Sequence, residues 1–177
     1  VILKKPDFSE KNIFLNGMIL SNKNIEKNII TNLKEIEFSS FSQFGEDGII
    51  SWITSKIPDL NKVFIEIGTE DYWESNTRFL LKSMNWKGYL IEGSKNHIKK
   101  IKSQRIYWQN NIKAINEFVT KENINNIIQE NIREKSIGLL SIDIDGNDLW
   151  VLKELNFISP DIVVCEYNTI FGDKYEL

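Results

Sequence analysis

Short apolar runs alternate along the chain with segments whose apolar residues recur at helical spacing. Five runs have the length and composition of buried strands, at residues 63–67, 88–92, 112–119, 137–142 and 161–166. Apolar residues three or four apart predict helices over 76–84, from Ser94 past Ile101, from Thr120 past Ile128, and over 147–155. This alternation predicts an α/β fold with a Rossmann-like, doubly wound, mostly parallel sheet and right-handed crossovers.

The segment before the first strand has a different character. Residues 1–38 are polar and rich in Asn and Lys, and they are predicted to form an N-terminal helical lead with one or two short helices, one of them near 24–33. A helix over 42–53 follows, and Pro58 stops it. Residues 39–177 are predicted to form one Rossmann-like domain. Because the chain begins at Val1 and not at Met, we expect an excised or processed segment.

Composition narrows the function classes. The chain has 177 residues, of which 41% are hydrophobic and 27% charged, and its net charge is −3, so bulk charge does not indicate a nucleic-acid partner. No apolar stretch is long enough to span a bilayer, and no secretory signal is visible. The single cysteine, Cys165, lies in an apolar run, which predicts a buried reduced thiol in a cytoplasmic protein. Composition leaves the oligomeric state open.

Several residues that often carry chemistry have plainer interpretations here. His97 is the only histidine, which excludes multi-histidine metal sites and disfavours a Ser-His-Asp triad. It lies among lysines, so we expect a solvated surface residue, and we interpret Lys95 to Arg105 as a solvated helix face. We expect four tryptophans to be core or semi-core residues: Trp52, Trp86, Trp108 and Trp150.

Acidic and amide side chains follow the predicted strands. The strand ends read Glu66-Ile-Gly68, Glu92-Gly-Ser94, Asn116-Glu-Phe118, Asp143-Ile-Asp-Gly-Asn-Asp148 and Glu166-Tyr-Asn168. In an open parallel sheet, ligands bind outside the carboxyl ends of the strands. Carboxylates crowded at one edge are costly unless they bind hydroxyls, amines, cations or a metal. The alternative is that these residues are helix caps and solvated turn residues.

The turn after the first strand separates two classes of cofactor. An acid at the end of the second strand, here Glu92, can accept hydrogen bonds from both ribose hydroxyls of an adenosine in NAD and S-adenosylmethionine sites alike. A pyrophosphate needs repeated glycines for close backbone approach, but this turn has only Gly68 and then the carboxylates Glu70, Asp71 and Glu74. Those carboxylates would repel a pyrophosphate and suit a cationic sulfonium with an α-amino group, which favours S-adenosylmethionine over NAD.

Four segments occur in order along the chain: Ser42-Gln-Phe-Gly-Glu-Asp47, Phe64-Ile-Glu-Ile-Gly68 with Glu74-Ser-Asn-Thr77, Trp86-Lys-Gly-Tyr-Leu-Ile-Glu-Gly93, and Leu140-Ser-Ile-Asp-Ile-Asp-Gly146. Together they resemble the FkbM-type methyltransferases. The resemblance covers roughly residues 40 to 172 and implies the class I methyltransferase fold. It also implies S-adenosylmethionine-dependent O-methylation of a hydroxyl on a sugar, glycan or natural product.

The resemblance also implies a set of cofactor-binding residues. Glu66 and Gly68 shape the cofactor turn, and Glu92 holds the ribose, with Gly93 beside it in the cofactor set. Asn116 to Phe118 flank the adenine, and Gln43 and Asn76 reach the methionine end. The family commonly has a second glycine in the turn, which this chain lacks, and two further strands, one of them antiparallel. We therefore expect either a partial chain or a sheet shortened after the fifth strand.

Methyl transfer to a hydroxyl requires placement of the acceptor and removal of its proton. The candidates for removing that proton or stabilising the alkoxide are Asp143, Asp145, Asp148, Glu166 and Asn168. We favour a plainer role for Asp148, as a first-turn helix acid. Asp145, Glu166 and Asn168 could form an oxygen-rich Mg²⁺ site for a sugar diol, as in metal-dependent O-methyltransferases. The competing hypotheses are a non-catalytic Rossmann-like binding module and a nicotinamide-dependent enzyme.

Overall fold

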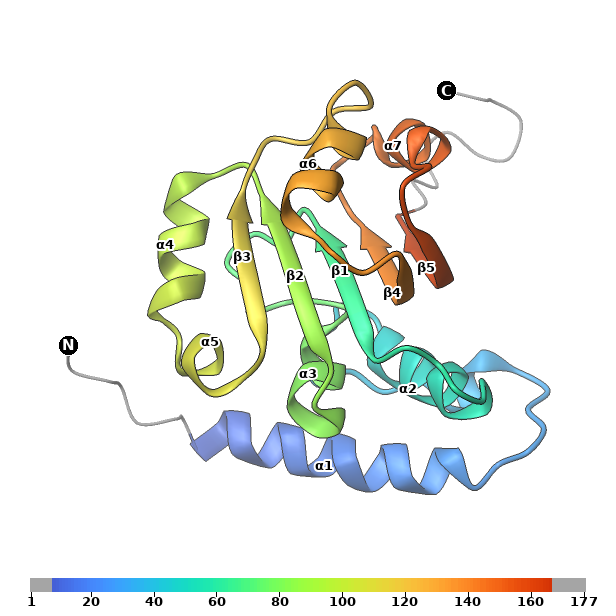
Figure 1. The fold of residues 1–177 in the computed structure, drawn as a ribbon. Coiled ribbons are helices and arrows are strands. Elements are labelled where there is room, and N and C mark those ends of the chain that lie inside the picture. Colours follow the sequence, from blue (N-terminus) through green and yellow to red (C-terminus); the bar gives the residue numbers. More distant parts are fainter. Residues whose placement is uncertain (1–7, 167–177) are drawn as a thin grey trace.

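The computed structural model describes residues 8–166 as alternating strands and helices preceded by one long helix (Figure 1). The strands are β1 Val63–Ile67, β2 Lys87–Glu92, β3 Ile112–Asn116, β4 Ser136–Ile142 and β5 Ser159–Cys165. The helices are α1 Phe8–Ile25, α2 Glu46–Lys56, α3 Arg78–Met84, α4 Lys95–Ser103, α5 Arg105–Gln109, α6 Ile124–Asn131 and α7 Asp148–Glu154, and a 3-10 turn, η1, covers Leu33–Glu35.

The five strands form one parallel sheet in the order β3-β2-β1-β4-β5. Phe64 of β1 is in register with Gly88 of β2 and Leu139 of β4, so β1 lies at the centre. The predicted α/β fold with a doubly wound sheet is confirmed, and the described sheet is wholly parallel. This order places the ends of β1, β2 and β4 side by side, at the point where the winding direction reverses.

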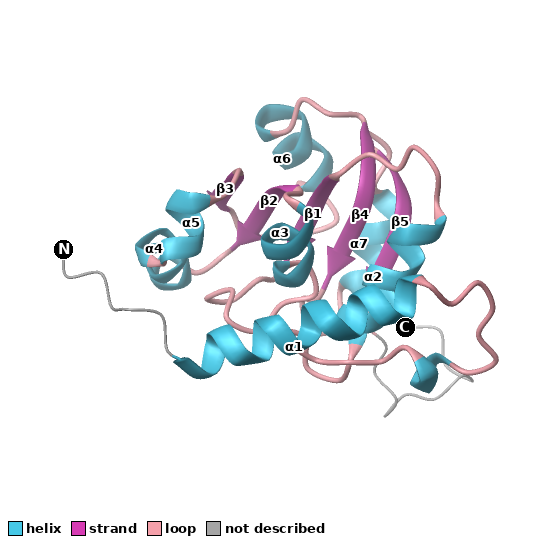
Figure 2. Ribbon diagram, turned by 90° about the horizontal axis from the view of Figure 1, so that it is seen from below, coloured by secondary structure: helices cyan, strands magenta, loops and turns pink. Residues whose placement is uncertain are grey.

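Alternating residues of the central strand supply two separate cores. Val63, Ile65 and Ile67 pack with residues of α6 and α7 on one face. Phe64 packs on the opposite face, with residues of α3, α4 and α5. Figure 2 shows α6 on one side of the sheet and α1, α3, α4 and α5 on the other. All five residues of β1 are buried, as its mostly apolar composition predicts.

The N-terminal region differs from the short helices that were predicted. One helix of 18 residues, α1, occupies Phe8–Ile25, and only the short turn η1 falls near the helix predicted at 24–33. Phe14 and Met18 of α1 pack against a buried cluster that contains Phe38 and Phe79. The position predicted for the helix was wrong because the apolar residues of α1 do not form one clear face: Ile13, Leu15, Ile19 and Leu20 are exposed, and packing of Phe14 and Met18 supports the helix.

One helix boundary differs from the prediction because a side chain binds the backbone, and two other elements differ as well. Helix α2 begins at Glu46 because the buried carboxylate of Asp47 accepts hydrogen bonds from the amides of Ser40, Phe41 and Ser42, which keeps that segment in a loop. Strand β3 ends at Asn116, three residues before the predicted end, and the short helix α5 was not predicted.

Several burial predictions also need correction. Trp108 and Trp150 are 74% and 40% exposed, so they are not core residues. Trp86 is buried as predicted, but Cys165 is only half-buried because β5 is an edge strand of the described sheet. Within residues 8–166, no helix combines the length and the apolar character that crossing a membrane requires.

Candidate functional site

Backbone hydrogen bonds join the carboxyl ends of four strands. The amide of Gly68, just after β1, donates to the carbonyl of Ile91 in β2 at 3.0 Å, and the amide of Asp143 donates to Ile67 at 3.0 Å. The amide of Glu166 donates to Ile142 at 3.2 Å, which adds the end of β5. The polar residues after these strands therefore lie at one edge of the sheet, as the sequence predicted.

Gly68 is required by close packing between strand ends. Its φ is +81°, in the region that favours glycine, and a Cβ there would lie 1.6 Å from the carbonyl oxygen of Asp143. No side chain fits at this distance. The single glycine of the turn thus serves the contact between the ends of β1 and β4.

The turn after Gly68 is held in an uncommon conformation by a buried cation. Glu70 and Tyr72 have positive φ values of 46° and 65°. The guanidinium of Arg78 is 2% exposed and donates to the Tyr72 carbonyl at 2.7 Å, and its carbon lies 4.7 Å from the ring centroid of Trp73. Arg78 also pairs with Glu10 of α1 at 3.2 Å, so α1 helps to support this turn.

Glu66 is buried and binds the loop before α3. Its carboxylate accepts hydrogen bonds from the Ser75 hydroxyl at 2.7 Å, the Asn76 amide at 3.1 Å and the Thr77 hydroxyl. Burial raises the pKa of Glu66, against the lowering effect of these donors. Sequence reasoning named Glu66 and Asn76 but missed Ser75 and Thr77, although two hydroxyls flanking Asn76 just before a helix were a visible signal.

Glu92, the predicted ribose acid, bridges two turns. One carboxylate oxygen accepts from the amide of Glu70 at 2.8 Å, and the other accepts from the amide of Ser94 at 2.7 Å. The Nδ1 atom of His97 lies 3.6 Å from the carboxylate of Glu92, and the residue is half-buried. The prediction of a fully solvated surface histidine was therefore wrong. Each carboxylate oxygen has two lone pairs, and acceptor capacity remains for further donors.

The remaining predicted cofactor residues lie at two places along the edge. The side-chain amide of Asn116 donates to the carbonyls of Glu92 and Gly93 at 2.9 and 3.0 Å, and a Cβ on Gly93 would meet the Phe118 ring at 3.0 Å. Asn76 lies across β1, where its side chain donates to the Ser141 hydroxyl at 3.2 Å. Gln43 is exposed. It lies in the loop whose Phe41 carbonyl accepts a hydrogen bond from the amide of Ser75.

A hollow of about 420 Å³ lies beside Phe118, within the size range of small-molecule sites. The Phe118 ring, 77% exposed, and Trp150 at the start of α7 are its aromatic residues. Trp150 was not predicted to line a site, because tryptophan is usually highly buried and was therefore expected in the core. The complete lining is Phe118, Val119, Thr120, Lys121, Glu122, Asn147 and Trp150.

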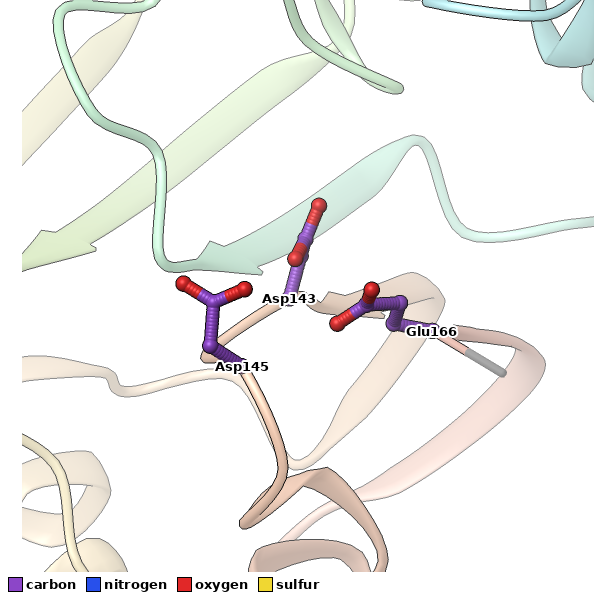
Figure 3. A group of neighbouring side chains, drawn as sticks. All are labelled: Asp143, Asp145 and Glu166. Atoms are coloured by element: carbon purple, nitrogen blue, oxygen red, sulfur yellow. The ribbon is translucent and has the colours of Figure 1, made fainter. Parts of the chain in front are cut away.

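Three carboxylates gather after β4 and β5, where Figure 3 shows Asp143, Asp145 and Glu166 turned toward a common space. One oxygen from each lies within 4.8 Å of the others, and all three residues are exposed. Partial loss of water and then the neighbouring carboxylates, Glu166 first, raise the pKa of Asp143 to about 6. Asn168, the third predicted metal ligand, lies outside the described residues.

Asp148 has a structural role that the sequence offered as its plain interpretation. It is buried and begins α7, and its carboxylate accepts from the amides of Ile144 and Gly146 at 2.9 Å each. These bonds fold the loop that carries Asp145, whose φ is 55°. Asp148 therefore positions the acidic cluster and is not a free member of it.

The fold and these residues define a Rossmann-like α/β protein with an acidic candidate site at the switch point of its sheet. Chemically, the edge offers hydrogen-bond acceptors, an aromatic hollow and a carboxylate whose pKa is raised toward neutrality. No protein-family model matches the chain, and no curated protein matches it by sequence.

Proposed function

We propose that this chain is an S-adenosylmethionine-dependent O-methyltransferase of the FkbM type, acting on a hydroxyl of a sugar, glycan or natural product. The observation that carries the proposal is the pairing of Glu92 with an acidic, single-glycine turn. The amide of Glu70, in that turn, binds the Glu92 carboxylate. This edge is rich in acceptors and negative charge, which suits a cationic ligand and opposes a pyrophosphate.

The chain's own residues fit the parts of such a cofactor. Glu92 retains lone pairs for ribose hydroxyls, and the exposed Phe118 ring borders a hollow that suits a planar base. Glu66 and Gly68 would shape the turn on which the cofactor lies, Gly93 and Asn116 would support the end near Glu92, and Gln43 and Asn76 would reach the methionine end. When bound, S-adenosylmethionine supplies a methyl group on a cationic sulfonium.

Proton removal from the acceptor is assigned to the acidic cluster. A general base works best when its pKa lies near the working pH, and the carboxylate of Asp143, with a pKa raised to about 6, is a stronger base than an ordinary aspartate. Asp145 and Glu166 lie within reach of the same hydroxyl because their oxygens are within 4.8 Å of those of Asp143. Asp143 Oδ would accept the hydroxyl proton.

A divalent cation is an alternative occupant of this cluster, and while it is bound its charge would lower the pKa of Asp143. Mg²⁺ binds one or two carboxylates and keeps several waters, so Asp145 and Glu166 would suffice as protein ligands, with Asp143 beside them. Bound at this place, the ion would orient two neighbouring hydroxyls of a sugar. Asn168 stays a predicted ligand.

One observation favours a second candidate function, a non-catalytic Rossmann-like binding module. Both oxygens of Glu92 already accept backbone amides, so a structural role satisfies this carboxylate without any ribose. In that case the turn after β1 is a fixed element of the fold. The two functions differ in whether the Glu92 carboxylate also accepts hydrogen bonds from the ribose of an adenosine, in addition to the two backbone amides.

Calorimetric titration with S-adenosylhomocysteine tests the proposal, with NAD titrated in parallel. We expect binding of S-adenosylhomocysteine, and none of NAD, by a chain whose circular dichroism shows a folded protein. Absence of S-adenosylhomocysteine binding by the folded chain would overturn the proposal and favour the binding module. Binding of NAD alone would favour a nicotinamide-dependent enzyme.

A further inference from the structure

The edge of the molecule beyond β3 carries several positive charges, most of them without an acidic partner among residues 8–166. Helices α4 and α5 form this edge in Figure 1. Between Glu92 and Glu117 the chain has no acidic residue, although the whole protein has a net charge of −3. This stretch therefore has the opposite charge to the candidate site.

The lysines of α4 divide into two groups by their partners. Lys100 pairs with Asp71 of the acidic turn at 3.3 Å. Lys95, Lys99 and Lys102 are spaced i, i+4 and i+7, so they form one stripe along the flank of α4 that faces away from Asp71. All three are exposed, and none has an ion pair with any residue from 8 to 166.

Two exposed residues of α5, the helix that follows α4 after Gln104, lie close to this stripe in the chain. Arg105 is exposed and likewise has no ion pair within the described part of the chain, and Trp108 is 74% exposed. We call Lys95, Lys99, Lys102, Arg105 and Trp108 the α4–α5 patch. Like charges at helical spacing repel one another, so the folded chain gains nothing internally from this arrangement. An external anionic surface would compensate it.

We propose that the α4–α5 patch docks the protein on an anionic lipid surface. Clusters of four or more Lys and Arg on an amphipathic helix are attracted to acidic phospholipids, and an exposed indole is stable at the level of the headgroups. Ile98 and Ile101, the apolar face of α4, are buried in the core, so the helix cannot insert. Contact is therefore peripheral, electrostatic and anchored by the Trp108 ring.

The observations favour a lipid surface over a nucleic acid. Lysine supplies three of the four charges, and a lipid surface attracts point charges without the bidentate geometry that arginine brings to phosphates. A nucleic-acid interface buries a large, positively charged area. Here the basic flank ends at the acidic turn, where Lys100 pairs with Asp71, and that negative charge would repel the phosphates of a nucleic acid. The proposal does not depend on the methyltransferase activity, and its test uses no cofactor.

Flotation of the full chain with lipid vesicles tests the docking. We expect binding to vesicles of equimolar phosphatidylcholine and phosphatidylglycerol, no binding to phosphatidylcholine alone, and loss of binding near 1 M salt, where the Debye length falls to about 3 Å. Each lysine removed should lower partitioning of the protein onto the vesicles roughly five-fold, so the triple variant K95Q/K99Q/K102Q should lower it roughly a hundred-fold. Trp108→Phe should abolish a blue shift of tryptophan emission on binding.

A charge-matched control separates the patch from net charge. The variant K23Q/K34Q/K153Q removes three exposed lysines on α1, η1 and α7 and should partition within a few-fold of the wild type. Equal losses in both triple variants would overturn the proposal, as would failure of the wild type to bind anionic vesicles. Binding of a single-stranded oligonucleotide by a chain that ignores those vesicles would also overturn it, in favour of nucleic acid.

Discussion

The carboxylate of Glu92, at the end of β2, accepts a hydrogen bond of 2.8 Å from the backbone amide of Glu70, in the turn after β1. This bond joins two acids across a gap of 22 residues and closes the turn over the end of the neighbouring strand. Glu92 is therefore both a candidate ligand for ribose and a support for the turn. The two roles are separable by substitution.

Glu92→Ala should weaken binding of S-adenosylhomocysteine by ~1–3 kcal/mol, the scale for losing hydrogen bonds to a charged group. Glu92→Gln should retain part of the support for the turn while losing the charge. Calorimetry gives the affinity, and denaturant unfolding reports stability. The control is Glu130→Ala, an exposed glutamate in α6. Unchanged affinity in Glu92→Ala would remove Glu92 from the cofactor site.

Gly68→Ala should destabilise the fold strongly, by about 3 kcal/mol or more, because its Cβ would lie 1.6 Å from a carbonyl oxygen. Gly146 provides the matched control: its φ is also positive, at +108°, but a Cβ there meets nothing within 4 Å. Gly146→Ala should cost only the conformational strain, ~1–2 kcal/mol. Urea unfolding of both variants measures the difference, and equal costs would contradict the close packing between β1 and β4.

Asp143→Asn should stabilise the protein at neutral and alkaline pH. The pKa of Asp143 is raised from 3.8 to about 6, so the folded chain binds this proton more tightly than the unfolded chain within that window. Stability is therefore lost as pH rises through the window, and the deficit remains above it. The asparagine variant removes the deficit, by less than about 1 kcal/mol because solvent screens the exposed carboxylate.

Thermal unfolding of Asp143→Asn at about pH 8 and about pH 4 checks this sign, since the gain should vanish at the lower pH. Asp161→Asn, at an exposed position in β5, controls for the loss of one negative charge. A gain that is equal at both pH values would contradict the raised pKa of Asp143.

Addition of Mg²⁺ should raise the unfolding temperature of the wild type more than that of Asp145→Asn, if the cluster binds the ion.

Glu10→Gln should destabilise the protein by ~1–3 kcal/mol because the buried Arg78 guanidinium loses its carboxylate. Burial opposes ionisation of Glu10, but hydrogen bonds from Lys82 and Arg78 outweigh it and lower its pKa. The wild type should lose this stabilisation as pH falls through that lowered pKa, whereas Glu10→Gln should not. Glu26→Gln, an exposed acid just after α1, is the control in denaturant unfolding across pH.

Much of the sheet could be predicted because its strands are buried on both faces. Val63–Ile67 is apolar at almost every position, so its boundaries matched the prediction. Helices α1 and α5 could not be predicted from their local sequence in the same way. Their formation depends on contacts with distant residues, such as Phe14 with Phe79, whose rings lie 6.1 Å apart.

The chemistry of the site was only partly visible in the sequence. The topology of a parallel sheet sufficed to gather Asp143, Asp145 and Glu166, because strand ends share one edge. The hydrogen bond between Glu92 and Glu70 was hidden, since it depends on a positive φ at a glutamate. The position of Asp148 in the first turn of a helix indicated its structural role, but its bonds to the amides of Ile144 and Gly146 could not be predicted from the local pattern.

Arg78 contacts both the carboxylate of Glu10 in α1 and the carbonyl of Tyr72 in the turn after β1. Local opening in a protein proceeds through contiguous cooperative units. Detachment of α1 would leave a buried charge unpaired beneath the turn, so the helix and the turn belong to one such unit. Slow amide exchange in α1 would therefore report an ordered turn some fifty residues away in sequence, and fraying of the helix would loosen the turn.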